Sequence, residues 1–308
     1  MDWLEKISIT CFAASYGVVL GLEFARIYFS KSTVRSALKI GLAIAGVFAH
    51  SAFLFHHTNV RFSQSGLWLG SWYGWCLAGA WLLAVAYLWL ALKKFNSPFG
   101  IFLLPVILAL IGWGSWMGAE SHFSADREKS IWMMVHGMAL LLGSAVVALG
   151  FVFGVMYLIQ SARLKSKKLS NSGSFRLPSL EWLRNSAERS LIVSAAFMAV
   201  GLLSGVASNL SQAIPWSDPI VLSSGILFAW LVIASLTSIF YRPARHGRKV
   251  AMLVSASFLF LVLELGIVWW SGHASSSQTE ENGDTVTRVD TIDTNHPKSI
   301  VVSQRAQS

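Results

Sequence analysis

The sequence predicts an all-α integral membrane protein, a polytopic bundle of about eight transmembrane helices with both termini on the outer face. Of the 308 residues, 54% are hydrophobic and only 13% are charged, whereas about 25% charged residues is usual for a soluble domain. Eight apolar runs are each long enough to cross about 30 Å of hydrocarbon as a helix. Helices are expected because they satisfy their own backbone hydrogen bonds in lipid.

The eight apolar runs follow one another with polar connections between them. The first carries Glu23 and Arg26 near its end and lacks the basic amino-terminal stretch of a cleavable signal peptide. The second contains His50, and the fourth contains Pro105, the one proline well inside a run. We expect helices over residues 7–29, 38–57, 69–92, 99–118, 131–160, 191–210, 219–241 and 250–271.

The basic residues are distributed unevenly between the connections. Seventeen of the 24 Lys and Arg residues lie in or beside the odd-numbered connections, at positions 26–39, 93–94, 163–189 and 242–249. Most acidic residues lie on the other side, so the positive-inside rule places the odd-numbered connections in the cytoplasm. The net charge of +9 is therefore a topology signal. No aromatic-interleaved basic groove accompanies it, and we expect a lipid bilayer and no nucleic acid as the partner.

The chain divides into one membrane domain and one tail. Residues 1–273 form the transmembrane domain, which includes a basic cytoplasmic loop at 161–190. In that loop, Pro178, Leu180 and Leu183 with the nearby charges predict a short amphipathic surface helix. Residues 274–308 are rich in Ser, Thr, Asp and Asn and poor in apolar residues, so we expect a disordered outer tail.

Two histidines fall on the outer face in this topology. His136 lies near the outer end of the fifth run, and His273 lies just beyond the eighth. The outer loop 208–219 contains Trp216 and Asp218 and no basic residue. Two neutral imidazoles that face each other are good axial ligands for heme iron, and an aromatic loop could cover the porphyrin. The alternative is that these residues are anchors at the lipid headgroups.

Other polar residues in the runs have simpler explanations. Glu23 and Arg26 are three residues apart on one helix and predict a local ion pair near the inner surface. His50 predicts an interhelical hydrogen bond. Glu264 has no local partner and is either a buried proton or ligand contact or a structural hydrogen bond. The small residues in Gly201–Gly205 predict a helix-packing face.

Several enzyme classes lack their motifs in this chain. There is no GxxxxGK[ST], HExxH, CxxC or CxxCH pattern, and the two cysteines sit inside apolar runs. No catalytic acid–base or nucleophile–base pair is visible. A small-solute transporter is a further alternative, but the sequence shows none of the inverted repeats typical of one.

The order of motifs after residue 130 resembles a known family. His136 and Gly137 begin a helix, the segment Leu177–Leu183 reads LPSLEWL, and Gly201–Gly205 and Pro215–Pro219 follow. This order resembles the cytochrome c assembly protein family, heme-handling membrane proteins that include CcsA, CcmC and HemX, over roughly residues 70–275. The resemblance implies a non-covalent heme b at the outer face. His136 and His273 would be its axial iron ligands, and Trp216 and Asp218 would end a tryptophan-rich motif.

The resemblance also implies a function in cytochrome c biogenesis at a bacterial cytoplasmic membrane. The chain would present heme to apocytochrome c together with a second assembly subunit, and any heme-attachment activity would rest on the family. Only one tryptophan, Trp216, stands in the loop where the family carries several. This departure and the short chain are similar to the HemX-like branch. The alternative is therefore a membrane regulator of heme biosynthesis, acting on the level of glutamyl-tRNA reductase, with a vestigial heme site.

Overall fold

The computed structural model describes residues 2–28, 33–64, 71–93, 98–117, 131–165, 177–212, 219–240 and 247–266. Within these ranges it contains eight α-helices and no strand, which confirms the predicted fold class. The eighth helix, Gly247–Gly266, is called the last helix below. The other seven are α1 (Asp2–Tyr28), α2 (Thr33–Gln64), α3 (Trp72–Lys93), α4 (Phe99–Met117), α5 (Ile131–Lys165), α6 (Leu180–Gln212) and α7 (Pro219–Phe240).

Most of these helices meet the length and hydropathy of a membrane span. Seven of them, including the last helix, are long and apolar enough to cross a bilayer, and α7 contains the shorter apolar stretch Leu222–Ser238. The chain is therefore a multi-pass membrane protein. Helices α5 and α6 have 35 and 33 residues, which is about 50 Å of helix against about 30 Å of hydrocarbon. Both therefore extend beyond the hydrocarbon core.

The start of α6 differs from the sequence prediction. A separate surface helix was expected around Leu180, but this segment forms the first turns of α6. Ser179 explains the early start, because its side-chain oxygen accepts a 3.4 Å bond from Trp182 N and its carbonyl accepts a 3.0 Å bond from Leu183 N. Leu183 is fully buried, so the segment packs into the bundle and does not lie on the membrane surface.

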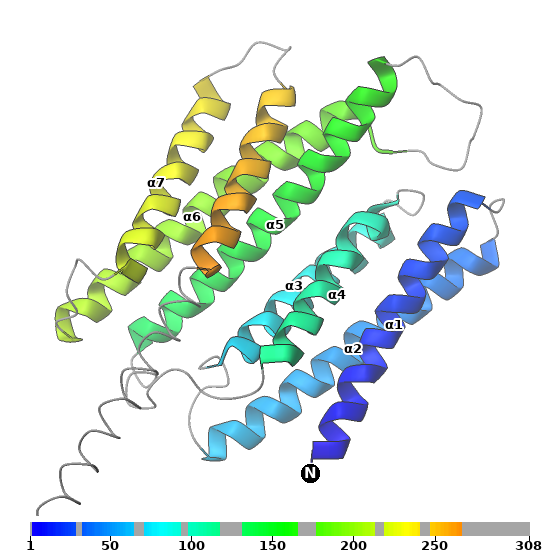
Figure 1. The fold of residues 1–308 in the computed structure, drawn as a ribbon, viewed down its shortest axis with the longest axis horizontal. Coiled ribbons are helices and arrows are strands. Elements are labelled where there is room, and N and C mark those ends of the chain that lie inside the picture. Colours follow the sequence, from blue (N-terminus) through cyan, green and yellow to red (C-terminus); the bar gives the residue numbers. More distant parts are fainter. Residues whose placement is uncertain are drawn as a thin grey trace, which may run out of the picture.

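The helices run alternately up and down, as Figure 1 shows. The carboxyl ends of α1, α3, α5 and α7 lie at the top of the view, beside the basic connections of the sequence. The start of α1 lies at the bottom, and the last helix, in orange, runs downward from the top of the view. This arrangement agrees with the predicted topology, in which the top is cytoplasmic and the bottom is the outer face.

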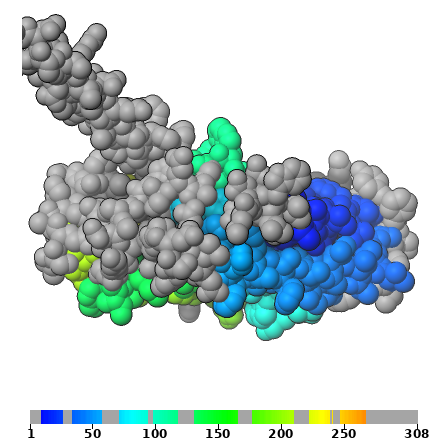
Figure 2. Space-filling model, turned by 90° about the horizontal axis from the view of Figure 1, so that it is seen from below, coloured from blue at the N-terminus to red at the C-terminus, as the bar shows by residue number. Residues whose placement is uncertain are grey.

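The bundle has two halves that share one continuous core. Helices α1–α4 pack with one another, α5 packs with α6 and α6 with α7, and α3 and α4 join the halves through α5. Figure 2, seen from below, shows α1 and α2 in blue at the opposite end of the molecule from α5 in green. At the inner end, Phe99 of α4, Phe153 of α5 and Trp182 of α6 form an aromatic cluster with ring centroids 5.5–6.4 Å apart.

Candidate functional site

His136 is the one candidate iron ligand that lies within the described residues. It is on α5, in the second turn from the outer end, and its side chain is partly exposed. His273, Trp216 and Asp218 lie outside the described residues. Their roles in a heme site therefore stay predictions.

The imidazole of His136 is held by the neighbouring helix. Its Nδ1 lies 2.7 Å from the backbone carbonyl oxygen of Gly201 on α6. A carbonyl oxygen can only accept a hydrogen bond, so Nδ1 is the nitrogen that carries the proton. In the neutral ring the lone pair is then on Nε2, which is the nitrogen able to bind a metal. Among the described residues, nothing forms a hydrogen bond with Nε2.

Two glycines on α6 make room for this contact. A Cβ on Gly205 would lie 2.9 Å from Nδ1 of His136, and a Cβ on Gly201 would lie 2.9 Å from Cδ2 of Leu140. The predicted packing face at 201–205 is therefore confirmed, and Gly205 also lies directly against the imidazole of His136. Sequence reasoning missed this second role. The available signal was the four-residue spacing of the glycines, which places both on one side of α6.

Aromatic and apolar side chains surround the outer end of α5. The indole of Trp75 on α3 lies against Gly137, since a Cβ there would be 3.4 Å from its Cζ2. Trp132 and Met134, each 51% exposed, lie in the first turn. Interfacial tryptophans of this kind are typical of the membrane boundary. His136 therefore lies at the level of the outer interface, on the face that the charge distribution predicts.

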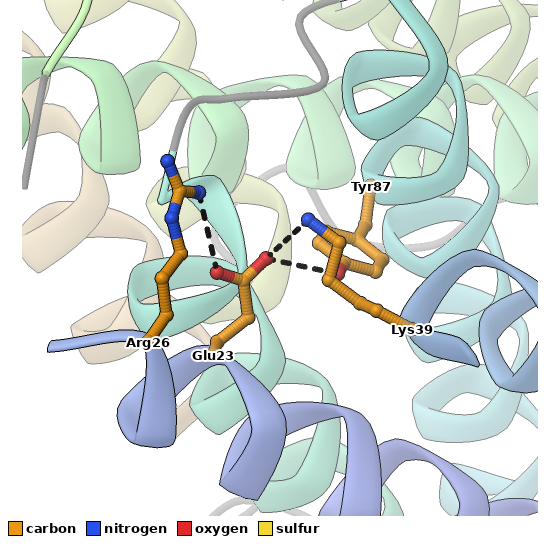
Figure 3. Close-up of polar contacts among 4 residues, drawn as sticks. All are labelled: Glu23, Arg26, Lys39 and Tyr87. Carbon is orange, nitrogen blue, oxygen red and sulfur yellow. Dashed lines mark hydrogen bonds and ion pairs between the residues drawn. The ribbon is translucent and has the colours of Figure 1, made fainter. Parts of the chain in front are cut away.

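A buried ionic cluster lies at the opposite, inner end of α1 (Figure 3). Oε1 of Glu23 accepts a 3.0 Å bond from Nζ of Lys39 on α2 and a 3.4 Å bond from the hydroxyl of Tyr87 on α3. Nη1 of Arg26 lies 3.9 Å from Oε2. The predicted Glu23–Arg26 pair is confirmed, but Lys39 is the closer cation. Lys39 and Tyr87 bind Oε1, and Oε2 has the ion pair with Arg26 but no hydrogen bond among the described residues. Because the charge of Glu23 is balanced by two cations, we assign the cluster a structural role.

The interhelical hydrogen bond predicted for His50 is also present. Nδ1 of His50 lies 3.4 Å from the hydroxyl of Tyr16, and the ring of Phe12 stacks on the imidazole with centroids 4.2 Å apart. His50 is fully buried by these contacts, which argues for packing and against a ligand site. Glu264 lies on the last helix, two residues before its end, and its two alternatives stay predictions.

The described residues contain no group of three or more His, Cys, Asp or Glu that could hold a metal ion. A site built on several protein ligands is therefore absent from this part of the chain. Heme iron needs only one imidazole on each face, and the geometry of His136 fits that requirement.

Comparison with known proteins identifies the chain. A family model described as "Cytochrome C assembly protein" matches residues 69–274, about two-thirds of the sequence. The chain belongs to the cytochrome c assembly protein family. The comparison with curated proteins and the comparison with solved structures each found no match. Membership confirms the resemblance seen in the sequence and gives the protein a role in cytochrome c biogenesis.

The cytochrome c assembly domain begins just before α3 and continues past the last helix. It includes His136 and the three predicted site residues outside the described ranges. Helices α1 and α2 precede the matched region. They nevertheless belong to the same core, because Glu23 of α1 accepts hydrogen bonds from both Lys39 of α2 and Tyr87 of the matched domain.

Proposed function

We propose that this cytochrome c assembly protein binds heme b at the outer face of a bacterial cytoplasmic membrane and delivers it to apocytochrome c. The observation that carries the proposal is the hydrogen bond of His136, which decides which ring nitrogen holds the proton. Its Nδ1 lies 2.7 Å from the carbonyl oxygen of Gly201, so in the neutral ring Nε2 carries the lone pair that can bind a metal. This nitrogen lies at the predicted outer end of a cytochrome c assembly domain.

In this proposal His136 and His273 would hold the heme iron. Trp216 would contact the ring, and Asp218 follows it in the sequence at the end of the loop. Bound heme supplies the iron and the vinyl groups to which the cysteines of apocytochrome c add. The chain holds and orients the group and keeps water from it with apolar side chains, which agrees with the absence of an acid–base pair from the sequence.

A second assembly subunit is part of the proposal. The outer connections between the described helices are short, at residues 65–70, 118–130 and 213–218, and the outer tail at 274–308 is predicted from its composition to be disordered. Apocytochrome c must nevertheless be positioned against the heme. We infer that a partner with an outer domain supplies this positioning.

The test is the absorption spectrum of the detergent-purified protein, oxidised and then dithionite-reduced. We expect a Soret band and sharp reduced α and β bands, as for a low-spin heme with two histidine ligands. His136→Ala and His273→Ala should each weaken the Soret band, and the double variant should abolish it. His56→Ala is the matched control, since His56 is exposed on α2 away from α5. An unchanged Soret band in the double variant would contradict the proposal.

A second candidate function is a HemX-like regulator of heme biosynthesis. Two observations favour it: the single tryptophan in loop 208–219 and the inner extensions of α5 and α6 beyond the hydrocarbon core. Replacing the cations at 167, 168 and 176 with serine should then change the cellular level of glutamyl-tRNA reductase. A constant enzyme level together with a Soret band in the wild-type protein would favour the first function.

A further inference from the structure

The carbonyl group of Gly201 accepts more hydrogen bonds than an ordinary helical carbonyl. Within α6 it receives the hydroxyl of Ser204 at 2.9 Å, and from α5 it receives Nδ1 of His136 at 2.7 Å. The second distance is shorter than the usual 2.9–3.0 Å or so for an N–H···O bond. One backbone oxygen thus links a candidate iron ligand to a serine on another helix.

The approach of the ring depends on the missing side chain of Gly205. A methyl group there would lie 2.9 Å from Nδ1 and 3.0 Å from Cε1 of His136, which is closer than real side-chain contacts. Any residue other than glycine would therefore move the imidazole away from the Gly201 oxygen. The contact requires both the acceptor at 201 and the gap at 205.

We propose that the Gly201 carbonyl positions His136 for heme binding. It holds the proton on Nδ1, leaves Nε2 as the nitrogen that would bind iron, and sets how much electron density the imidazole would donate. This inference rests on the proposed heme site. An N–H bound to a good acceptor makes the imidazole a stronger ligand, as the hydrogen-bonded partners of metal-binding histidines do. Gly201 and Gly205 are positioning residues, since neither touches the iron.

Ser204 makes it possible to predict the sign of the change in heme midpoint potential, which a simple packing role for Gly201 would not predict. The one hydroxyl proton of Ser204 is shared between the carbonyl oxygens of Val200 at 2.8 Å and Gly201 at 2.9 Å, so Ser204 competes in part with His136 for the Gly201 oxygen. Ser204→Ala removes the competitor, so the bond from His136 should strengthen. An imidazole that donates more electron density stabilises ferric iron, so the heme midpoint potential should fall. Gly205→Ala breaks the same bond, and the potential should rise.

The first experiment uses the protein without heme. Nitrogen-15 NMR of histidine-labelled protein, with the His136 signal assigned by its loss in His136→Gln, reports which ring nitrogen carries the proton. We expect a protonated Nδ1 and a bare Nε2 in the wild type, and a mixture of tautomers in Gly205→Ala. Gly225→Ala is the control, because nothing lies within 4 Å of the added Cβ. A wild-type ring with its proton on Nε2 would overturn the inference whether or not heme binds.

The second experiment is a redox titration of the heme-loaded protein. A fall in midpoint potential for Ser204→Ala and a rise for Gly205→Ala, with Gly225→Ala unchanged, would support the inference. Equal potentials in all variants would overturn it and leave the heme site itself standing. Ser204→Ala removes one hydroxyl and adds no bulk, so we expect this variant to fold. It therefore decides the test if Gly205→Ala fails to fold. A wild-type protein that binds no heme would refute the proposed function, and the NMR result would still decide the role of Gly201.

Discussion

Nζ of Lys39 lies 3.0 Å from Oε1 of Glu23, and this contact joins α2 to α1 inside the inner end of the bundle. Both side chains are almost completely buried, at 7% and 1% exposure. Tyr87 of the cytochrome c assembly domain donates to the same oxygen. The pair therefore fixes the two helices outside the family match onto the helices within it.

Removing one partner of this pair should be costly. Lys39→Met leaves the Glu23 carboxylate buried beside a longer, 3.9 Å contact to Arg26, and we expect a loss of about 3–5 kcal/mol of stability. Thermal unfolding in detergent, followed by tryptophan fluorescence, measures it. Arg189→Met, an exposed cation on α6, should change the unfolding temperature little. The double variant Glu23→Gln/Lys39→Met should recover part of the loss, and an additive loss would contradict the pairing.

Gly100 should be intolerant of any side chain. A Cβ there would lie 2.7 Å from Cγ of Glu23, so Gly100→Ala pushes the carboxylate away from its partners. We expect a loss of about 1–3 kcal/mol, as is usual for overpacking. Gly112→Ala is a control on the same helix, because nothing lies within 4 Å of its added Cβ. If both variants unfold at the same temperature, the close packing of α4 on Glu23 is wrong.

The sequence was a good guide to the helices because apolar length is a one-dimensional signal. Each of the eight apolar runs corresponds to a helix in the structure. The ends were less predictable: α2 continues to Gln64 and α6 begins at Leu180. An apolar run ends where the hydrocarbon ends, but a helix can extend past it into the polar region. Its ends depend on backbone hydrogen bonds and on capping residues such as Ser179, which lies before the apolar run of α6.

The site was less predictable because its contacts join different helices. The position of His136 at the outer interface follows from hydropathy and charge alone. Its bond to Gly201 depends on the rotation and register of α6 against α5, which no local pattern encodes. The same reason explains why Arg26 was predicted as the partner of Glu23 and Lys39 was missed, since only the former is a neighbour on the same helix.

The contact between α5 and the last helix should also depend on a glycine. A Cβ on Gly154 would lie 2.5 Å from Cγ2 of Val254 and 3.0 Å from the carbonyl oxygen of Ala251. The backbone oxygen cannot turn away as a flexible side chain can, so Gly154→Ala should separate the helices and lower the unfolding temperature. Adding Val254→Ala should restore only part of the stability, because the clash with the backbone remains. Full restoration would mean that the side chain alone sets the spacing.

The orientation in the membrane is open to a direct test by cysteine labelling. In a protein whose two native cysteines are replaced by serine, Ile131→Cys places a thiol at the outer end of α5, where the native side chain is 72% exposed. Lys165→Cys places one at the opposite end of the same helix, also at an exposed position. The basic residues beside Lys165 predict that its end is cytoplasmic. A membrane-impermeant maleimide should therefore label position 131 in intact cells and position 165 only after permeabilisation. The reverse pattern would place His136 on the cytoplasmic side, where apocytochrome c could not receive heme from it.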